Sequence, residues 1–461
     1  MQMNPSNQVA GRISVAARIE RLPLTKYQRL IFMVIATAWL FDSIDLAIMT
    51  FMLGSIKTDL GLTAAQAGLL ASSSFLGMLV GALIAGIAAD RIGRKPVFQV
   101  SMILWGAGSL ACAFAPDVNY LMLFRVLLGI GMGMEFPVGL SILSEFLPTK
   151  GRGKYIAILE GFWPIGFILA GTAAYLFLPI VGWRGIFLLL AVPSVFVFIF
   201  RQMVPESARW LESRGRIVEA DQVVSHIEEK VKECLNGQEL PPVDPVFAAS
   251  KSTSSKSKIS ALWENGYAKR TFMTLCLWFF ALLGYYGLTT WLGALLQNAG
   301  YEVTKSVFYT IIISFAGIPG FMVAAWLVEV WGRKPTCILM LLGSASCAYI
   351  YGQTASVQAP VAQLIAAGLS MQFFFFGMWS VLYAYTPELF PTQIRATGAG
   401  LASAVGRVGS LIGPSVIGVI LPAVGQGGVF ALGAVSFLIA ALVVLVLGVE
   451  TKGRSLEEVS N

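Results

Sequence analysis

The chain of 461 residues is 56% hydrophobic and only 12% charged, with a net charge of +7. A soluble domain carries roughly 25% charged residues, so this composition excludes an ordinary soluble protein. The positive charge is scattered over short loops, which argues against a nucleic-acid partner. The five cysteines show no metal-binding or redox spacing, and we expect no cofactor.

Apolar segments of 18 or more residues recur along nearly the whole chain. Each can cross a bilayer core of ~30 Å as a helix, and none shows the alternation of a barrel strand. We therefore predict an all-α membrane protein with 12 transmembrane helices in two six-helix bundles. The predicted spans are 30–51, 64–89, 97–115, 119–143, 154–177, 182–203, 271–297, 306–329, 335–353, 358–384, 396–421 and 426–448.

Loop charge predicts the orientation of these spans in the membrane. The loops after spans two, four, eight and ten carry most of the loop Lys and Arg, whereas the opposite loops show only Lys57, Arg184 and Lys305. The basic side is the expected cytoplasmic side, and both termini lie on it. The predicted organisation is a cytoplasmic segment 1–29, a bundle 30–204, a cytoplasmic linker 205–270 with a surface helix near 216–235, a second bundle 271–449 and a cytoplasmic tail 450–461.

Two loop motifs occur twice, about 240 residues apart. DRIGRKP at 90–96 recurs as EVWGRKP at 329–335, and SEFLPTKGR at 144–152 recurs as PELFPTQIR at 387–395. Two parallel repeats joined by a long loop are the plan of major facilitator transporters, whose substrate site lies between the halves. We expect the motifs to gate the cytoplasmic side, the alternative being plain solubility and topology charge. The gating candidates are Asp90, Arg91, Gly93, Arg94, Lys95, Glu145 with Arg152, Glu329, Arg333, and Glu388 with Arg395.

Further motifs carry a family resemblance. GIAADRIGRKP at 86–96 and RVLLGIGMG at 125–133 resemble the major facilitator superfamily, and PESARWL and VETKGRSLEE resemble its sugar-porter-like and organic-ion branches. FDSIDLAIMTF in span one and GMEFPVGLSILSEFLPTKGRGKYIAILEGFWPIG across spans four and five resemble the bacterial niacin permease group of aromatic-acid and metabolite proton symporters. The resemblance implies proton-driven uptake of a small organic anion such as nicotinate across a bacterial inner membrane. We expect a monomer.

Charged side chains inside a membrane span are costly and usually serve function. Asp42 and Asp45 share one helix face in span one, where two close carboxylates favour binding of a proton by one of them. The single histidine, His226, lies in the linker, so proton coupling must use carboxylates. The alternative is that one aspartate only neutralises a cation such as Arg125 of span four.

Two further acids lie within predicted spans. Glu135 either faces the cavity between the halves or contacts a neighbouring helix. Glu160 shares a face with Trp163, and its alternative role is bonding to loop cations such as Lys154. The proton-coupling candidates are Asp42, Asp45, Glu135, Glu160 and Arg125.

Arg407 lies about eleven residues into span eleven, among small neighbours that leave room around it. An arginine can hold a carboxylate with two parallel hydrogen bonds, so this position predicts an anionic substrate. The alternative is an ion pair between helices. Aromatic side chains on bundle-facing spans can sandwich a flat ring, although most aromatics in such spans only pack. The substrate-binding candidates are Arg407, Trp379, Tyr383, Gln372, Tyr285, Tyr286, Trp163 and Glu135.

Two other functions fit parts of the sequence. A sugar or polyol proton symporter is favoured by PESARWL and VETKGRSLEE, but midspan amides are few. A sensor with a transporter fold would need a signalling domain, for which the linker is too short. The chain shows no nucleotide-binding loop, metal cluster or nucleophile elbow, so we do not expect an enzyme or ATP-driven transport.

Overall fold

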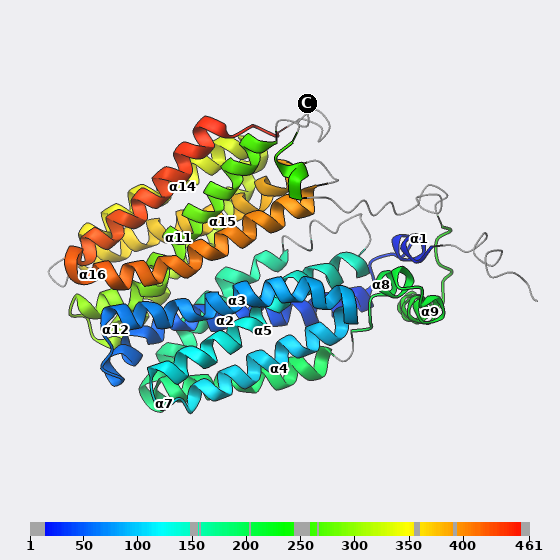
Figure 1. The fold of residues 1–461 in the computed structure, drawn as a ribbon, viewed down its shortest axis with the longest axis horizontal. Coiled ribbons are helices and arrows are strands. Elements are labelled where there is room, and N and C mark those ends of the chain that lie inside the picture. Colours follow the sequence, from blue (N-terminus) through cyan, green and yellow to red (C-terminus); the bar gives the residue numbers. More distant parts are fainter. Residues whose placement is uncertain are drawn as a thin grey trace, which may run out of the picture.

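The structure is a computed structural model that describes residues 14–147, 155, 158–201, 204–243, 259–264, 267–354, 360–390 and 394–452. These residues form helices and connecting loops, with no strand among them. Figure 1 shows two bundles of long helices lying along each other, the first half of the chain in one and the second half in the other.

The first bundle is built from helices whose lengths suit a membrane crossing. The motif loop 90–95 lies between the second and third of them, where α3 ends and α4 begins at Gly93. Membrane-length helices in this half are α2 (Lys26–Asp59), α3 (Ala64–Ile92), α4 (Arg94–Ala113), α5 (Val118–Phe146) and α7 (Phe162–Arg201).

The second bundle repeats this plan. A short turn divides one of its crossings into α12 and α13, and a loop glycine, Gly332, again precedes the helix that follows the motif. Its helices are α11 (Ala268–Asn298), α12 (Val303–Ser314), α13 (Gly317–Val330), α14 (Arg333–Thr354), α15 (Val361–Glu388) and α16 (Arg395–Leu447).

Two helices are too long for a single crossing. At 1.5 Å per residue, the 40 residues of α7 would extend ~60 Å, about twice the bilayer core. Non-helical glycines, Gly182 in α7 and Gly425 in α16, interrupt them with φ of 65° and 64°. Figure 1 shows α16 folding back on itself. The ten candidate spans among the described residues are therefore consistent with the twelve predicted crossings.

Three short helices pack together at one end of the first bundle and contact its long helices (Figure 1). They are α1 (Val15–Glu20), α8 (Ala208–Ser213) and α9 (Ile217–Cys234), and a single 3-10 turn, η2 (Ile259–Leu262), precedes the second bundle. The surface helix expected near 216–235 is thus α9. The KSTSSKSK segment lies outside the described residues.

The first loop motif forms a charged cluster at the start of α4. Arg94 contacts Asp90 at 3.2 Å and Glu145 at 3.6 Å. The backbone N–H groups of Arg94 and Lys95 donate to Glu206 (2.9 and 3.2 Å), which belongs to the PESARWL segment. A carboxylate at these unpaired N–H groups stabilises the helix start. Arg91 is exposed at the end of α3.

The second motif repeats this arrangement with tighter contacts. Arg333 binds Glu388 through two hydrogen bonds (2.9 and 3.0 Å) and Glu329 at 3.0 Å. Glu450 accepts from the N–H groups of Arg333 and Lys334 (2.9 and 3.0 Å), as Glu206 does in the first half.

The partners of the two motif acids differ in part from those that we expected. Glu145 and Glu388, expected beside Arg152 and Arg395, contact Arg94 and Arg333. Arg152 lies outside the described residues, and the Arg395 side chain donates to the Phe390 carbonyl (3.4 Å). We call the region of both clusters the loop-motif end.

At the opposite end of the long helices, the two halves touch closely. A Cβ added to Gly68 of α3 would lie 2.7 Å from the Pro414 carbonyl and 3.1 Å from the Gly418 Cα of α16. Ser415 donates to Ser72 across the same contact (2.7 Å). Backbones approach this closely only where side chains are small. The halves are therefore held together at the end away from the loop motifs.

Candidate functional site

A cavity lies between the two halves, near the middle of the long helices. About 70 Å³ of it can hold the centre of a water molecule, which is room for several waters. Its surface is mostly apolar and rich in aromatic side chains, with a few hydroxyl and charged groups, as is typical of small-molecule sites. The polar and aromatic lining residues are Ser43, Thr50, Phe75, Phe136, Glu160, Trp163 and Phe167 from the first half, and Trp278, Tyr285, Tyr286, Thr289, Thr290, Phe321, Phe376, Trp379, Tyr383, Ser403, Arg407 and Ser410 from the second.

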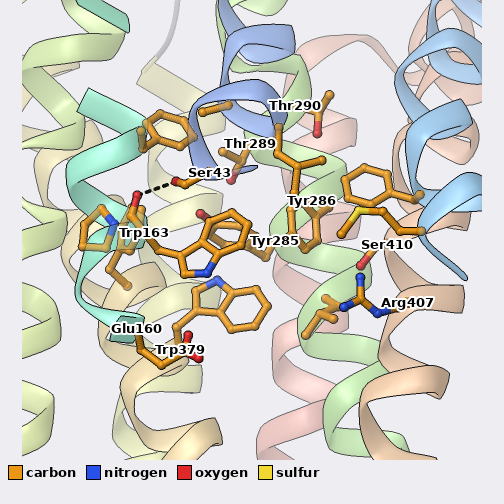
Figure 2. A pocket seen from close by; sticks show the side chains of 18 of the residues that line it. Ser43, Glu160, Trp163, Tyr285, Tyr286, Thr289, Thr290, Trp379, Arg407 and Ser410 are labelled. Carbon is orange, nitrogen blue, oxygen red and sulfur yellow. Dashed lines mark hydrogen bonds between the residues drawn. The ribbon is translucent and has the colours of Figure 1, made fainter. Parts of the chain in front are cut away.

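Arg407 brings a positive charge into this cavity from α16. It is largely buried, and Figure 2 shows its guanidinium beside Ser410 at the cavity wall. No carboxylate of a described residue forms an ion pair with it. Its guanidinium carbon lies 5.0 Å from the centre of the Phe136 ring of the first half. A buried cation without an ion-pair partner in the described chain can bind an anionic ligand.

Aromatic rings from both halves surround the same space. Trp379 stacks on Tyr383 (5.7 Å between ring centres, 22° between planes) and meets Tyr285 edge-on at 5.3 Å. Phe136 stacks on Trp163 at 5.9 Å and 22°. These rings can hold a flat ligand by stacking and edge contacts.

The first half contributes one carboxylate to the cavity lining. Glu160 is only 5% exposed, and its Oε2 atom has no hydrogen-bond partner in the described part of the chain. Figure 2 shows Glu160 and Arg407 on opposite sides of the neighbouring Trp163 and Trp379 indoles. Tyr286 and Tyr383 lie within electrostatic reach of both charges. The cavity therefore offers an acidic and a basic group to one ligand.

The aspartates of span one have different surroundings. Asp45 accepts a hydrogen bond from Arg125 (2.8 Å) and another from the indole of Trp105 (3.1 Å), and both charged side chains are at most 1% exposed. Asp45 and Arg125 thus form a buried ion pair within the first half. Asp42 is also buried and lies within electrostatic reach of Arg407, but neither aspartate lines the cavity.

Six of the eight predicted substrate-binding residues line the cavity. Gln372 and Glu135 do not. Gln372 lies one turn from Phe376 on α15 and is fully buried, without a hydrogen-bond partner for either amide atom. Glu135 of α5 is 1% exposed and does not line the cavity, whereas the next residue, Phe136, does. A step of one residue on a helix turns the side chain ~100°, which moves it off the cavity face.

The sequence interpretation missed Trp278, Thr289 and Phe136 as cavity residues. Trp278 precedes Tyr285 by seven residues and Thr289 follows it by four, so all three share one face of α11. That spacing could have identified both. Phe136 has no such signal, because its role depends on the contact with Arg407 from the other half.

Ionisable groups outside the spans also interact across long sequence distances. Arg18 of α1 binds Asp221 and Glu228 of α9, each at 2.6 Å. Hydrogen bonding to Glu228 raises the pKa of Arg18 above its ordinary value. Burial acts to raise the pKa of Glu228, but the bonds from Arg18 and Arg21 outweigh it and hold the pKa below its usual range. These contacts stabilise the packing of α1 on α9.

The family model described as sugar (and other) transporter matches residues 32–461. The chain belongs to this family of the major facilitator superfamily. It is a multi-pass membrane transporter and not an enzyme. Since its curated relatives include several bacterial transporters, the family implies a place in the inner membrane.

Relatives and solved structures agree with this assignment. The chain is 37% identical over 448 residues to the niacin transporter NiaP of Acinetobacter baylyi, covering 97% of this chain and 100% of that protein. It is 29% identical to the 4-hydroxybenzoate transporter PcaK of the same organism, over 89% and 88% of the two chains. The partially occluded, inward-open structure of the xylose transporter XylE from Escherichia coli has a TM-score of 0.75 at 19% identity, over 94% of this chain and 100% of that one. This likeness confirms the predicted fold.

Proposed function

We propose that this transporter takes up a small aromatic or heteroaromatic carboxylate, such as nicotinate, by proton-coupled symport and alternating access. The observation that carries the proposal is Arg407, which places a cation without an ion-pair partner in the described chain in an aromatic-lined cavity. Arg407 binds the carboxylate, and Trp379, Tyr383 and Phe136 contact the ring. Relatives named for niacin and for 4-hydroxybenzoate support this class of substrate.

Proton coupling belongs to the acids of the first half in this proposal. A substrate anion entering a site of low dielectric strengthens the interaction among the buried charges nearby. Asp42 lies within electrostatic reach of Arg407. Asp45, about one turn after Asp42 on the same face of α2, forms an ion pair with Arg125 of α5. We propose that anion binding at Arg407 changes the proton affinity of this acidic group, which links the two fluxes.

The substrate leaves through the loop-motif end, which we propose faces the cytoplasm together with both termini. The close contact of Gly68 with Gly418 at the far end supports a conformation closed on the outer side. The contacts of Arg94 with Glu145 and of Arg333 with Glu388 are then made and broken during the cycle, as the cytoplasmic side changes between its closed and open states.

A sugar site would need a different lining. Sugars are bound mainly by hydrogen bonds, so amide side chains at the cavity would favour them. The cavity surface of the described residues has no asparagine or glutamine and instead carries a cation and a carboxylate. This lining favours an organic acid over a hexose or a polyol.

Binding to the purified transporter at two pH values tests the proposal. The panel is nicotinate, benzoates, short-chain acids and hexoses, with wild type beside Arg407→Gln. We expect wild type to bind aromatic carboxylates and Arg407→Gln to bind all of them at least about thirtyfold more weakly, because a buried charge partner is lost. Binding of hexoses without carboxylates would overturn the proposal.

A further inference from the structure

Across the cavity from Arg407 lies a second pair of polar groups that the proposed function does not use for binding. Glu160 and Trp163 are three residues apart, so they lie on one helix face, and both line the cavity. Glu160 Oε2 and Trp163 Nε1 are both buried, and neither has a hydrogen-bond partner among the residues that the structure describes. Figure 2 shows Glu160 on the far side of the Trp163 and Trp379 indoles from Arg407.

Leaving buried polar atoms without partners is unfavourable, so most native proteins avoid it. Here an acceptor from Glu160 and a donor from Trp163 both remain open in the lining of one cavity. A carboxylate only accepts hydrogen bonds and an indole N–H only donates them. Glu160 therefore complements a ligand group that donates a hydrogen bond, and a hydroxyl group can in addition accept one from an indole N–H.

The surroundings leave few other partners for Glu160. Among the described residues, Tyr286 of α11 and Tyr383 of α15 lie within its electrostatic reach, and both also interact with Arg407. Neither tyrosine makes a hydrogen bond to Glu160 in this conformation. A ligand whose carboxylate lies at Arg407 would direct the far edge of its ring toward Glu160 and Trp163.

We propose that Glu160 and Trp163 form a second recognition subsite, which binds a hydrogen-bond donor on the ring of the substrate. The cavity then selects aromatic carboxylates that carry a hydroxyl group or a protonated ring nitrogen over the unsubstituted ring acid. This inference rests on the proposed function, because Arg407 fixes the carboxylate and thereby the direction of the ring.

The test compares affinities within a set of similar ligands. Binding of benzoate, 3-hydroxybenzoate, 4-hydroxybenzoate and nicotinate is measured on purified wild type, Glu160→Gln, Glu160→Met and Trp163→Phe. We expect wild type to prefer the better hydroxybenzoate isomer to benzoate by at least about tenfold, because its hydroxyl fills a buried hydrogen-bonding position that benzoate leaves open. Glu160→Met should bring this ratio close to one. Glu160→Gln, which keeps an acceptor without charge, should give an intermediate ratio.

Trp163→Phe keeps the stacked ring but removes the donor, so it should weaken hydroxybenzoate binding more than benzoate binding. Glu228→Gln, which neutralises an acid in the linker helix α9, is the control and should leave every affinity unchanged.

The pH dependence of binding distinguishes a ring hydroxyl from a protonated ring nitrogen as the donor. If a protonated ring nitrogen binds Glu160, the affinity for nicotinate relative to 4-hydroxybenzoate falls as pH rises from 5 to 8. A constant ratio overturns the proposal for nicotinate.

A role of Glu160 in proton coupling alone predicts a different pattern, in which substitution changes all four affinities by the same factor. That result, or equal wild-type affinities for benzoate and the hydroxybenzoates, overturns the second subsite and leaves the proposed function standing. Failure of wild type to bind any of the four acids would overturn the proposed function itself.

Discussion

The two halves of the transporter agree at their loop-motif ends and differ in the membrane interior. Arg94 with Glu145 and Glu206 in the first half matches Arg333 with Glu388 and Glu450 in the second. Inside the bundles, the first half holds a neutralised pair, Asp45–Arg125, and the carboxylate Glu160 at the cavity, whereas the second half presents Arg407. The difference teaches that the repeated motifs serve the common mechanics of the fold, while substrate chemistry depends on residues that the repeats do not share.

The largest effect on stability is expected from the interior ion pair. Asp45→Asn leaves Arg125 charged and buried without its carboxylate, which should cost about 3–5 kcal/mol of unfolding free energy. Thermal unfolding in detergent measures this loss. The double variant Asp45→Asn/Arg125→Met should recover most of it, because it removes the uncompensated charge. If the single variant unfolds like wild type, the pair contributes nothing to the fold.

A smaller loss of stability is expected when either motif cluster is disrupted, and the loss should differ between the two clusters. Arg333 holds Glu388 with two hydrogen bonds at 2.9 and 3.0 Å, whereas Arg94 meets Glu145 at 3.6 Å. Arg333→Gln should therefore destabilise by about 1–3 kcal/mol and Arg94→Gln by about 1 kcal/mol or less. Thermal unfolding of the two matched variants provides the comparison. Equal losses would show that the difference in geometry has no energetic consequence.

The smallest effect on stability is expected when the pH is lowered, which should weaken the packing of α1 on α9. The folded pKa of Glu228 is lowered, so its contribution is present above the unfolded pKa of about 4.3 and is lost as pH falls through the folded value. Arg18 remains charged throughout this range, since its pKa is raised. Protection of the amides of residues 14–20 from hydrogen exchange, measured relative to the intrinsic exchange rate at each pH, should fall below about pH 4, and Glu228→Gln should remove this fall. The same fall in protection in Glu228→Gln would assign the effect to another group.

Most of the fold could be predicted from the sequence, because the bilayer permits few alternatives to long apolar helices. The spans, the two repeats and the amphipathic helix near 216–235 follow directly from composition and spacing. Gly182 and Gly425 fall at the predicted boundaries between spans, but the sequence pattern could not show that the helices on either side join through a single non-helical glycine.

The candidate site was only partly accessible from the sequence. Arg407 and the aromatics Trp379, Tyr383, Tyr285 and Tyr286 stood out as unusual midspan residues, and all of them line the cavity. A pair between Arg125 and an aspartate of span one was among the predicted alternatives, and the structure shows it with Asp45. Which of the two aspartates pairs, and where Phe136 lies, depend on contacts between helices that are distant in sequence. Glu135 illustrates the limit, because the difference between a cavity residue and a buried contact is one step along the helix.

Uptake of labelled nicotinate and 4-hydroxybenzoate into proteoliposomes, with and without an imposed proton gradient, tests the central claim most directly. The account predicts that wild type accumulates at least one of these acids only when the gradient is directed inward, and that Arg407→Gln accumulates neither although it folds normally. Accumulation of the acids by Arg407→Gln at the wild-type rate, or wild-type uptake of xylose in place of both acids, would contradict it.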